Sequence, residues 1–310
     1  MARLIVLGAL AALFFSSTFI LNRAMSLDGA SWVWSASLRY AFMLPLLLVW
    51  TLVSGGPTAV RQAFVLFWKN PLFWTLAGSI GFGVFYAGVT LAAAFSPGWV
   101  TATTWQVTIL ATPLVLALLG RRVPRKGLAF TALIFVGIVL VNLEQAGVSP
   151  TGGNLWGIAA VLIAAVAYPL GNQLVWEAKN GGSRYVPAIN DKGLDAGRTP
   201  TLLLTIGSIP FWLVLVALTQ PPPPSQGQVV QTALVALFAG VIATSLFLRA
   251  RSQAKNAYEL AATDATQSLE VVFSLLGETL LLAGPWPGVW GAVGIALAVT
   301  GLVLYVCRQV

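Results

Sequence analysis

Residues 4–22 read LIVLGALAALFFSSTFILN, nineteen residues without a charged side chain. An apolar run of about 20 residues is the length that an α-helix needs to cross the bilayer's hydrocarbon core, which is about 30 Å thick. The run has no small-residue cleavage site and continues into Asn22-Arg23, so we interpret it as a retained helix and not as a signal peptide. This stretch therefore predicts a membrane-spanning helix.

The rest of the chain repeats this pattern. Of its 310 residues, 58% are hydrophobic and 8% are charged, whereas soluble domains have about 45–50% apolar and about 25% charged residues. Only helices and closed barrels satisfy the backbone in lipid, and a barrel would show alternating segments of about 10 residues. We therefore predict an all-α polytopic membrane protein with ten transmembrane helices, which excludes a soluble protein, a disordered chain and a nucleic-acid binder. The nine further spans are 30–53, 72–95, 98–119, 127–143, 154–176, 199–219, 228–248, 257–283 and 288–307.

The basic residues fall on one side of this topology. Ten helices place both termini on the same side, and the connectors there carry fifteen of the seventeen Lys and Arg residues. Because basic connectors stay cytoplasmic, we expect a multi-pass protein of the inner (plasma) membrane with both termini inside. This distribution explains the net charge of +8 without a nucleic-acid partner. The longest connector, residues 177–198, has four glycines and is interpreted as a flexible cytoplasmic loop.

The predicted helices divide into two sets of five, in residues 1–145 and 150–310. An odd number of helices in each half gives the halves opposite orientations, which is the inverted-repeat plan of many secondary transporters, with a binding site between the repeats. Residues 117–120 (ALLG), in the fourth helix, are similar to residues 274–277 (SLLG), in the ninth. We therefore predict two inverted five-helix repeats around a central cavity, which a monomer would complete.

Three segments resemble a known family: residues 11–19 (AALFFSSTF), 36–41 (ASLRYA) and 267–278 (QSLEVVFSLLGE). They are similar to the ten-helix, EamA-like exporters of the drug/metabolite transporter superfamily, with its multidrug efflux branch as one candidate. The chain departs from the family where it has Phe15-Ser16-Ser17 in place of Trp-Gly-Ser, and Val271 in place of a frequent proline. The resemblance implies a five-plus-five inverted fold that exports amino acids, metabolites or drugs.

Ionisable groups inside spans are costly and mark function by default. Glu270 lies at the middle of the ninth span, so its carboxyl must be paired, protonated or in contact with water. It suits a proton-coupling site or a cation site, and a structural carboxyl is the alternative. Arg39 and Glu278 lie at similar depth, and we expect an ion pair between them. The alternatives are a transport role for Glu278 and a clamp on a substrate carboxylate for Arg39.

Four neutral residues are further candidates for the substrate site. Gln106 and Gln267 occupy related places in the two halves and could hydrogen-bond a substrate, with bonding between helices as the alternative. Trp105 and Tyr86 lie deeper than the interfacial aromatic residues and could hold a planar, hydrophobic or cationic substrate. Packing is the alternative role for each ring.

Motifs for chemistry are absent from the sequence. The chain has no histidine, a single cysteine and no phosphate-binding glycine loop, so we expect no metal site, no cofactor and no enzyme activity. We predict a secondary transporter that exports small organic solutes, such as amino acids, metabolites or lipophilic drugs, by alternating access. Protons or the solute's own gradient would power it. An importer of the same fold and an intramembrane lipid-modifying enzyme are the alternatives.

Overall fold

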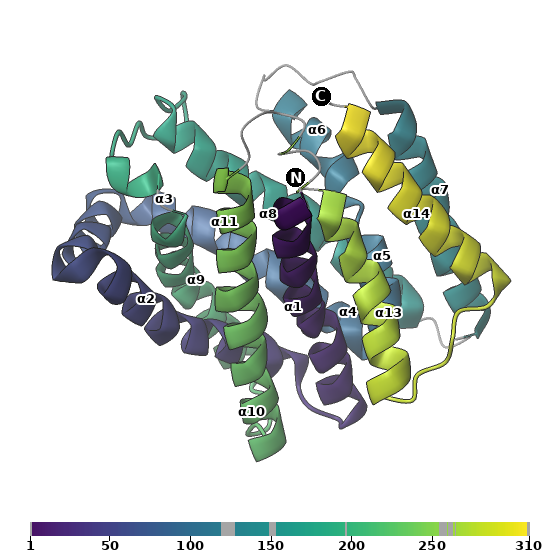
Figure 1. Cartoon of the computed structure of the whole chain (residues 1–310). Helices are drawn as coiled ribbons and strands as arrows, with labels where there is room; N and C mark the ends of the chain where they lie inside the picture. Colours follow the sequence, from purple (N-terminus) through teal and green to yellow (C-terminus); the bar gives the residue numbers. More distant parts are fainter. Residues whose placement is uncertain are drawn as a thin grey trace.

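The computed structural model describes residues 2–118, 128–148, 153–195, 197–253, 259, 263 and 265–308. This part of the chain forms helices and contains no strand. Figure 1 shows a bundle in which α1 begins and α14 ends on the same side, as an even number of crossings requires. The α-helices are α1 (Ala2–Leu27), α2 (Trp32–Lys69), α3 (Pro71–Gly78), α4 (Phe85–Phe95), α5 (Gly98–Trp105), α6 (Thr108–Leu118), α7 (Leu128–Val148), α8 (Gly153–Lys179), α9 (Arg198–Thr219), α10 (Gln226–Val235), α11 (Thr244–Gln253), α13 (Leu269–Leu281) and α14 (Val289–Arg308).

Seven helical segments of the described chain are long and apolar enough to cross a membrane: Ala2–Leu27, Trp32–Lys69, Pro71–Phe95, Phe130–Gly147, Leu155–Lys179, Arg198–Thr219 and Gln226–Ala250. The other three predicted spans contain shorter helices. The fourth is interrupted between α5 and α6, the ninth contains the 3₁₀ turn η4 (Thr266–Ser268), and the last has the apolar segment Val289–Tyr305. The chain is therefore an all-α polytopic membrane protein, as predicted. Part of the 257–283 span and residues 119–120 of the similar tetrapeptides lie outside the described residues.

Helix α2 continues well beyond the predicted span 30–53. It reaches Lys69 through a kink at Gly56, whose φ of 69° lies in the left-handed region that favours glycine. Pro57 explains the position of the kink, because proline disfavours the α conformation in the preceding residue but is well suited to the first turn of a new helix. The sequence predicted a connector here, and the structure has a second helical segment.

The connector 177–198, predicted as a flexible loop, packs in part against the bundle. Val186, Ile189 and Leu194 are buried in a cluster with Leu66 and Phe67 of the α2 extension. The Ile189 N–H also donates a hydrogen bond to the carbonyl oxygen of Ala178, at 2.7 Å. The physical reason is that burial of these three apolar side chains lowers the free energy by more than the conformational entropy of the glycine-rich backbone would if the connector stayed unpacked.

Two spans contain π-helical turns, and close helix packing accompanies one of them. The turn η1 (Ser79–Val84) joins α3 to α4, and η3 (Ala236–Ala243) joins α10 to α11. A Cβ added at Gly81, within η1, would lie 2.9 Å from the Cα of Gly171 on α8. The absence of side chains at these glycines therefore allows the third span to approach α8 closely.

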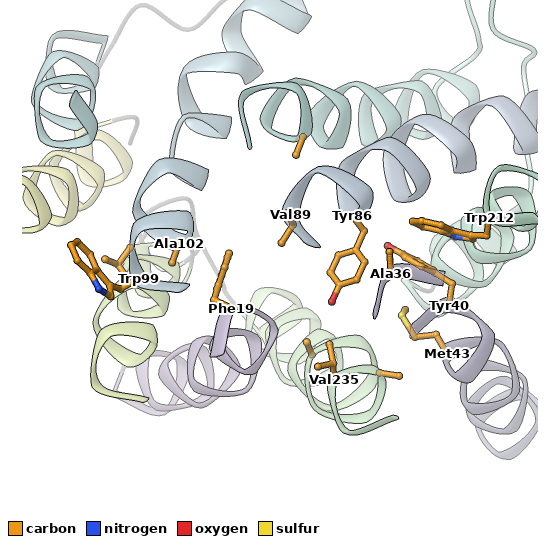
Figure 2. Packing of buried hydrophobic residues seen from close by; sticks show 14 of the residues in the cluster. Phe19, Ala36, Tyr40, Met43, Tyr86, Val89, Trp99, Ala102, Trp212 and Val235 are labelled. Carbon is orange, nitrogen blue, oxygen red and sulfur yellow. The ribbon is translucent and has the colours of Figure 1, made fainter. Parts of the chain in front are cut away.

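Helix α1 has a central place in the bundle, and Figure 1 shows it between α11 and α13. Near its start Gly8 faces Thr266, and near its end Ile20 faces Gly277. Helix α1 and the segment formed by η4 and α13 therefore run side by side in the same direction. Figure 2 shows the core beside α1, where Phe19, Tyr40, Tyr86 and Trp212 are buried.

Candidate functional site

Glu270 is a buried carboxyl in the middle of the bundle. It stands at the second position of α13, directly after η4, and its side chain is 6% exposed. Thr266 in η4 faces Gly8 of α1, and Gly277 in α13 faces Ile20 of α1. Glu270 lies between Thr266 and Gly277 in the chain, so it lies beside the middle of α1. Within the described residues it has neither a hydrogen bond nor an ion pair.

This setting limits the states that Glu270 can adopt. A carboxylate that is removed from water is very unfavourable unless a cation or hydrogen-bond donors compensate its charge. No described side chain supplies this compensation. The carboxyl can therefore bind a proton or a cation that arrives from outside the protein, and either event would change the charge in the core.

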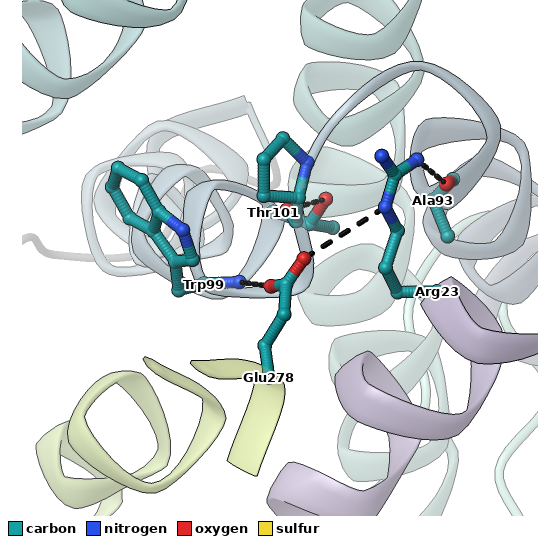
Figure 3. A network of polar contacts seen from close by, with 6 residues as sticks. Arg23, Ala93, Trp99, Thr101 and Glu278 are labelled. Carbon is teal, nitrogen blue, oxygen red and sulfur yellow. Dashed lines mark hydrogen bonds and ion pairs between the residues drawn. The ribbon is translucent and has the colours of Figure 1, made fainter. Parts of the chain in front are cut away.

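Glu278 lies about two turns further along α13 than Glu270. It belongs to a polar network that Figure 3 shows. Its Oε2 accepts a hydrogen bond from the backbone N–H of Trp99 at 3.1 Å, and its Oε1 lies 3.7 Å from Nε of Arg23. The Arg23 Nη1 also donates to the carbonyl oxygen of Ala93 at 3.0 Å. Glu278 thus lies at the start of α5, where unpaired N–H groups favour a negative charge.

The predicted ion pair between Arg39 and Glu278 is therefore wrong. Arg23, at the end of α1, takes the place that was expected for Arg39. The sequence indicated similar depths for Arg39 and Glu278, but depth along two helices does not determine which faces meet. Helix α1 packs directly on α13 and brings Arg23 to Glu278.

Arg39 instead packs on aromatic rings. Its guanidinium carbon lies 3.9 Å from the centre of the Tyr86 ring and 5.8 Å from the centre of the Tyr40 ring. The side chain is 7% exposed, and its buried Nε has no hydrogen-bond acceptor. No carboxylate of the described residues lies within ion-pair distance of this guanidinium.

Asn22 connects α1 to the same tyrosine. Its Nδ2 donates a hydrogen bond to the Tyr86 hydroxyl oxygen at 2.9 Å, while its buried Oδ1 has no partner. Asn22 was not among the site residues predicted from the sequence. Its only signal was a polar amide at the end of an apolar run, and the contact with Tyr86, 64 residues away, depends on helix packing.

The candidate rings Tyr86 and Trp105 lie in two aromatic groups that join at Phe85, whose ring centre is 5.9 Å from that of Tyr86. Around Tyr86, the Tyr40 ring stacks on Trp212 with centres 5.1 Å apart and an interplanar angle of 20°, and it lies 5.4 Å from the ring of Phe82. Figure 2 shows Tyr40, Tyr86 and Trp212 in this arrangement. The second group joins Trp105 to Phe85 and Tyr168, with centres 4.9 Å and 5.5 Å apart.

The two candidate amides both lie where helices are interrupted. Gln106 follows α5 and donates from Nε2 to the Ala102 carbonyl oxygen at 3.3 Å, so its amide makes a local bond. Gln267 lies in η4, and its buried Nε2 has no hydrogen-bond acceptor. Gln267 and Glu270 are three residues apart around the same turn, and no described residue hydrogen-bonds to the Gln267 Nε2 or to the Glu270 carboxyl.

Comparisons with known proteins agree with this architecture. Residues 2–310 match the family described as "EmrE: Putative multidrug resistance efflux transporter". The chain is 38% identical over 317 residues to "Uncharacterized protein YjlA" of Bacillus subtilis (strain 168), covering 97% of this chain and 93% of the relative. It is 36% identical over 267 residues to the "Uncharacterized 42.1 kDa protein in intracellular alkaline protease 3'region" of Shouchella clausii, covering 81% of this chain and 65% of that protein.

A solved crystal structure has a similar fold, with a TM-score of 0.59 at 14% sequence identity, covering 98% of this chain and 96% of the other. At this identity the likeness concerns the fold alone. The family match extends over nearly the whole chain and agrees with the apolar helices of the structure. The chain belongs to the EmrE-like multidrug resistance efflux transporter family of the drug/metabolite transporter superfamily.

Proposed function

We propose that the protein is a secondary transporter that exports small organic solutes by alternating access, with Glu270 as its proton-coupling group. The observation that carries this proposal is a glutamate, 94% buried in the middle of the bundle, whose carboxyl has no partner among the described residues. Ionisable groups at this depth are characteristic of proton relays and ion pathways in transporters. Binding and release of a proton at Glu270 would alter the stability of the core around α1 and α13.

Irregular helices support the proposed division into halves 1–145 and 150–310. In a five-plus-five repeat the third span corresponds to the eighth, and the fourth to the ninth. The third and eighth spans both contain π-helical turns, and the fourth and ninth are interrupted at Gln106–Val107 and at Thr266–Ser268. Matching irregularities of this kind favour an inverted repeat, and discontinuous helices commonly form the binding sites of such carriers.

We place the solute path between these interrupted helices. Gln267 stands beside Glu270, and Gln106 and Trp105 occupy the corresponding place in the other half. Tyr86 would contribute from α4. A single chain contains both halves, so a monomer would suffice, and the basic connectors favour an orientation with both termini in the cytoplasm.

Proton coupling can be measured with the purified full chain in liposomes that contain a pH-sensitive dye. The panel would include aromatic and aliphatic amino acids, a purine and tetraphenylphosphonium. We expect at least one solute to drive proton movement in the wild type, Glu270→Gln to abolish this movement, and Glu270→Asp to retain part of it.

Asp195→Asn is the matched control, because it also neutralises a carboxylate but at an exposed position beside Lys179. It should transport like the wild type. If solute-driven proton movement persists unchanged in Glu270→Gln, Glu270 is not the coupling group. If no solute moves protons in the wild type although solute flux is measurable, transport is driven by the solute gradient and the coupling proposal is wrong.

A further inference from the structure

We propose that Arg39, Asn22 and Tyr86 form a subsite for a carboxylate-bearing solute whose neighbouring carbon carries a hydrogen-bond donor, such as a 2-amino or 2-hydroxy acid. This inference rests on the proposed transport function and specifies its substrate class. It assigns to Arg39 the role of binding an anionic group of the solute.

The first step is that Arg39 lacks an anion. The residue is 93% buried, and its Nε has no hydrogen-bond acceptor. The rings of Tyr86 and Tyr40 offer their negative faces, which stabilise a cation but do not replace a hydrogen-bond acceptor. A planar guanidinium is well suited to binding a carboxylate through two parallel hydrogen bonds.

The second step is that four other carboxylates of the described chain are engaged or lie on helices that do not pack closely on α2. Glu278 accepts from Trp99 and lies beside Arg23, and Glu144 accepts from the N–H groups of Gly288 and Gly291. Glu177 accepts from Gln173. Glu270 is on α13, an element that makes no close packing contact with α2. The anion that would complete the Arg39 site is therefore best supplied by the solute.

The third step is the free acceptor on Asn22. Its amide is anchored because Nδ2 donates to the Tyr86 hydroxyl at 2.9 Å, while Oδ1 remains buried and unpaired. Arg39 packs on the ring of the same tyrosine. Tyr86 thus contacts both the Arg39 guanidinium, a donor without an acceptor, and Asn22, whose Oδ1 is an acceptor without a donor. Together they complement a carboxylate with an adjacent ammonium or hydroxyl group.

The fourth step concerns the body of the solute. Tyr40, Trp212 and Phe82 surround this place with aromatic rings, and all three belong to the buried core or pack against it. Flat apolar faces of this kind favour a solute with an aromatic or planar side group. A lipophilic cation would instead meet the positive charge of Arg39, so the subsite disfavours it.

Equilibrium binding to the purified full chain in detergent tests the inference without a proton gradient. The probes form a matched series: L-phenylalanine, 3-phenylpropanoate (which lacks the 2-amino group), phenethylamine (which lacks the carboxylate) and tetraphenylphosphonium. We expect the wild type to bind phenylalanine more tightly than 3-phenylpropanoate, and to bind both at least tenfold more tightly than phenethylamine.

The variants separate the roles of the two residues. Arg39→Gln should weaken binding of both carboxylates at least tenfold, with part of the affinity recovered in Arg39→Lys. Asn22→Leu, which is similar in size, should weaken phenylalanine and leave 3-phenylpropanoate nearly unchanged. Arg23→Gln is the control, because this arginine already donates to the Ala93 carbonyl oxygen and lies beside the Glu278 carboxylate. This variant should leave the order of affinities unchanged.

The result that overturns the inference is a wild type that binds phenethylamine or tetraphenylphosphonium but neither carboxylate, and this result holds even if Arg39→Gln does not fold. Carboxylate binding that is unchanged in a folded Arg39→Gln overturns it as well. Carboxylate binding in detergent needs no proton gradient, so it is measured independently of proton movement in the liposome assay. Carboxylate binding without solute-driven proton movement would therefore overturn the proposed coupling and leave the subsite standing. Proton movement without carboxylate binding would overturn the subsite and leave the coupling standing.

Discussion

Glu278 accepts a hydrogen bond from the backbone N–H of Trp99, 179 residues earlier in the chain, at a distance of 3.1 Å. The contact attaches α13 to the first turn of α5. Glu144 makes a similar contact from the first proposed half to the second. It lies on α7 and accepts from the N–H groups of Gly288 and Gly291 at the start of α14, both at 2.8 Å. Each carboxylate thus accepts hydrogen bonds at the start of a helix in the other proposed half.

The network around Glu278 predicts a loss of stability on its removal. Glu278→Ala leaves the Trp99 N–H without its acceptor and the Arg23 guanidinium without its neighbouring carboxylate. We therefore expect the free energy of unfolding to fall by roughly 1.5–3 kcal/mol, the range for hydrogen bonds to charged groups. Unfolding in mixed detergent micelles would measure it. A double-mutant cycle with Arg23→Gln should show coupling between the two residues, and strictly additive effects would contradict the ion pair.

The close approach at Gly81 predicts that even a methyl group is harmful there. In Gly81→Ala the new Cβ would lie 2.9 Å from the Cα of Gly171, a backbone atom that cannot move aside cheaply. We expect a loss of about 1–3 kcal/mol, as for other overpacked sites. Gly147→Ala is the control, since nothing lies within 4 Å of its Cβ position and alanine favours a helix. Equal stabilities of the two variants would refute the packing of the third span on α8.

The packed connector predicts different effects for two of its apolar residues. Leu194 is 3% exposed and belongs to the cluster with Leu66, whereas Tyr185 is 83% exposed. Leu194→Ala should therefore cost about 2–5 kcal/mol of local stability and increase the rate at which a protease cuts the connector. Tyr185→Ala should leave the cleavage rate near that of the wild type. Rapid cleavage of the wild-type connector at the same rate as the Leu194→Ala variant would restore the flexible-loop interpretation.

The topology can be tested with single cysteines, because the chain has one cysteine, Cys307. In a Cys307→Ser background, Ser225→Cys lies in the proline-rich connector before α10, and Gly181→Cys lies in the connector after α8. With cytoplasmic termini, an impermeant maleimide added to intact cells should label position 225 and not position 181. Labelling of position 181 alone would reverse the proposed orientation.

The arrangement of spans was accessible from the sequence because lipid imposes a local requirement. Each segment must satisfy its own backbone hydrogen bonds and present apolar side chains over about 20 residues, so a run such as residues 4–22 is visible without its neighbours. The burial of Glu270 followed in the same way from its position within an apolar stretch. The structure differs from the prediction where packing between distant segments outweighs local backbone preferences. Examples are the Gly56–Pro57 kink, beyond which α2 continues, and the connector in which Leu194 is buried.

The class of the protein and its apolar segments follow from the amino-acid sequence, because they depend on composition along one helix. Which side chains meet is visible only in the folded chain. The tertiary structure assigned Arg23 to Glu278, left Arg39 on the Tyr86 ring, and brought Asn22 to the same tyrosine. The physical reason is that partners on different helices depend on the rotation of each helix about its axis. That rotation is set by packing between residues far apart in the chain, such as Gly81 and Gly171, and leaves no periodic trace in the sequence.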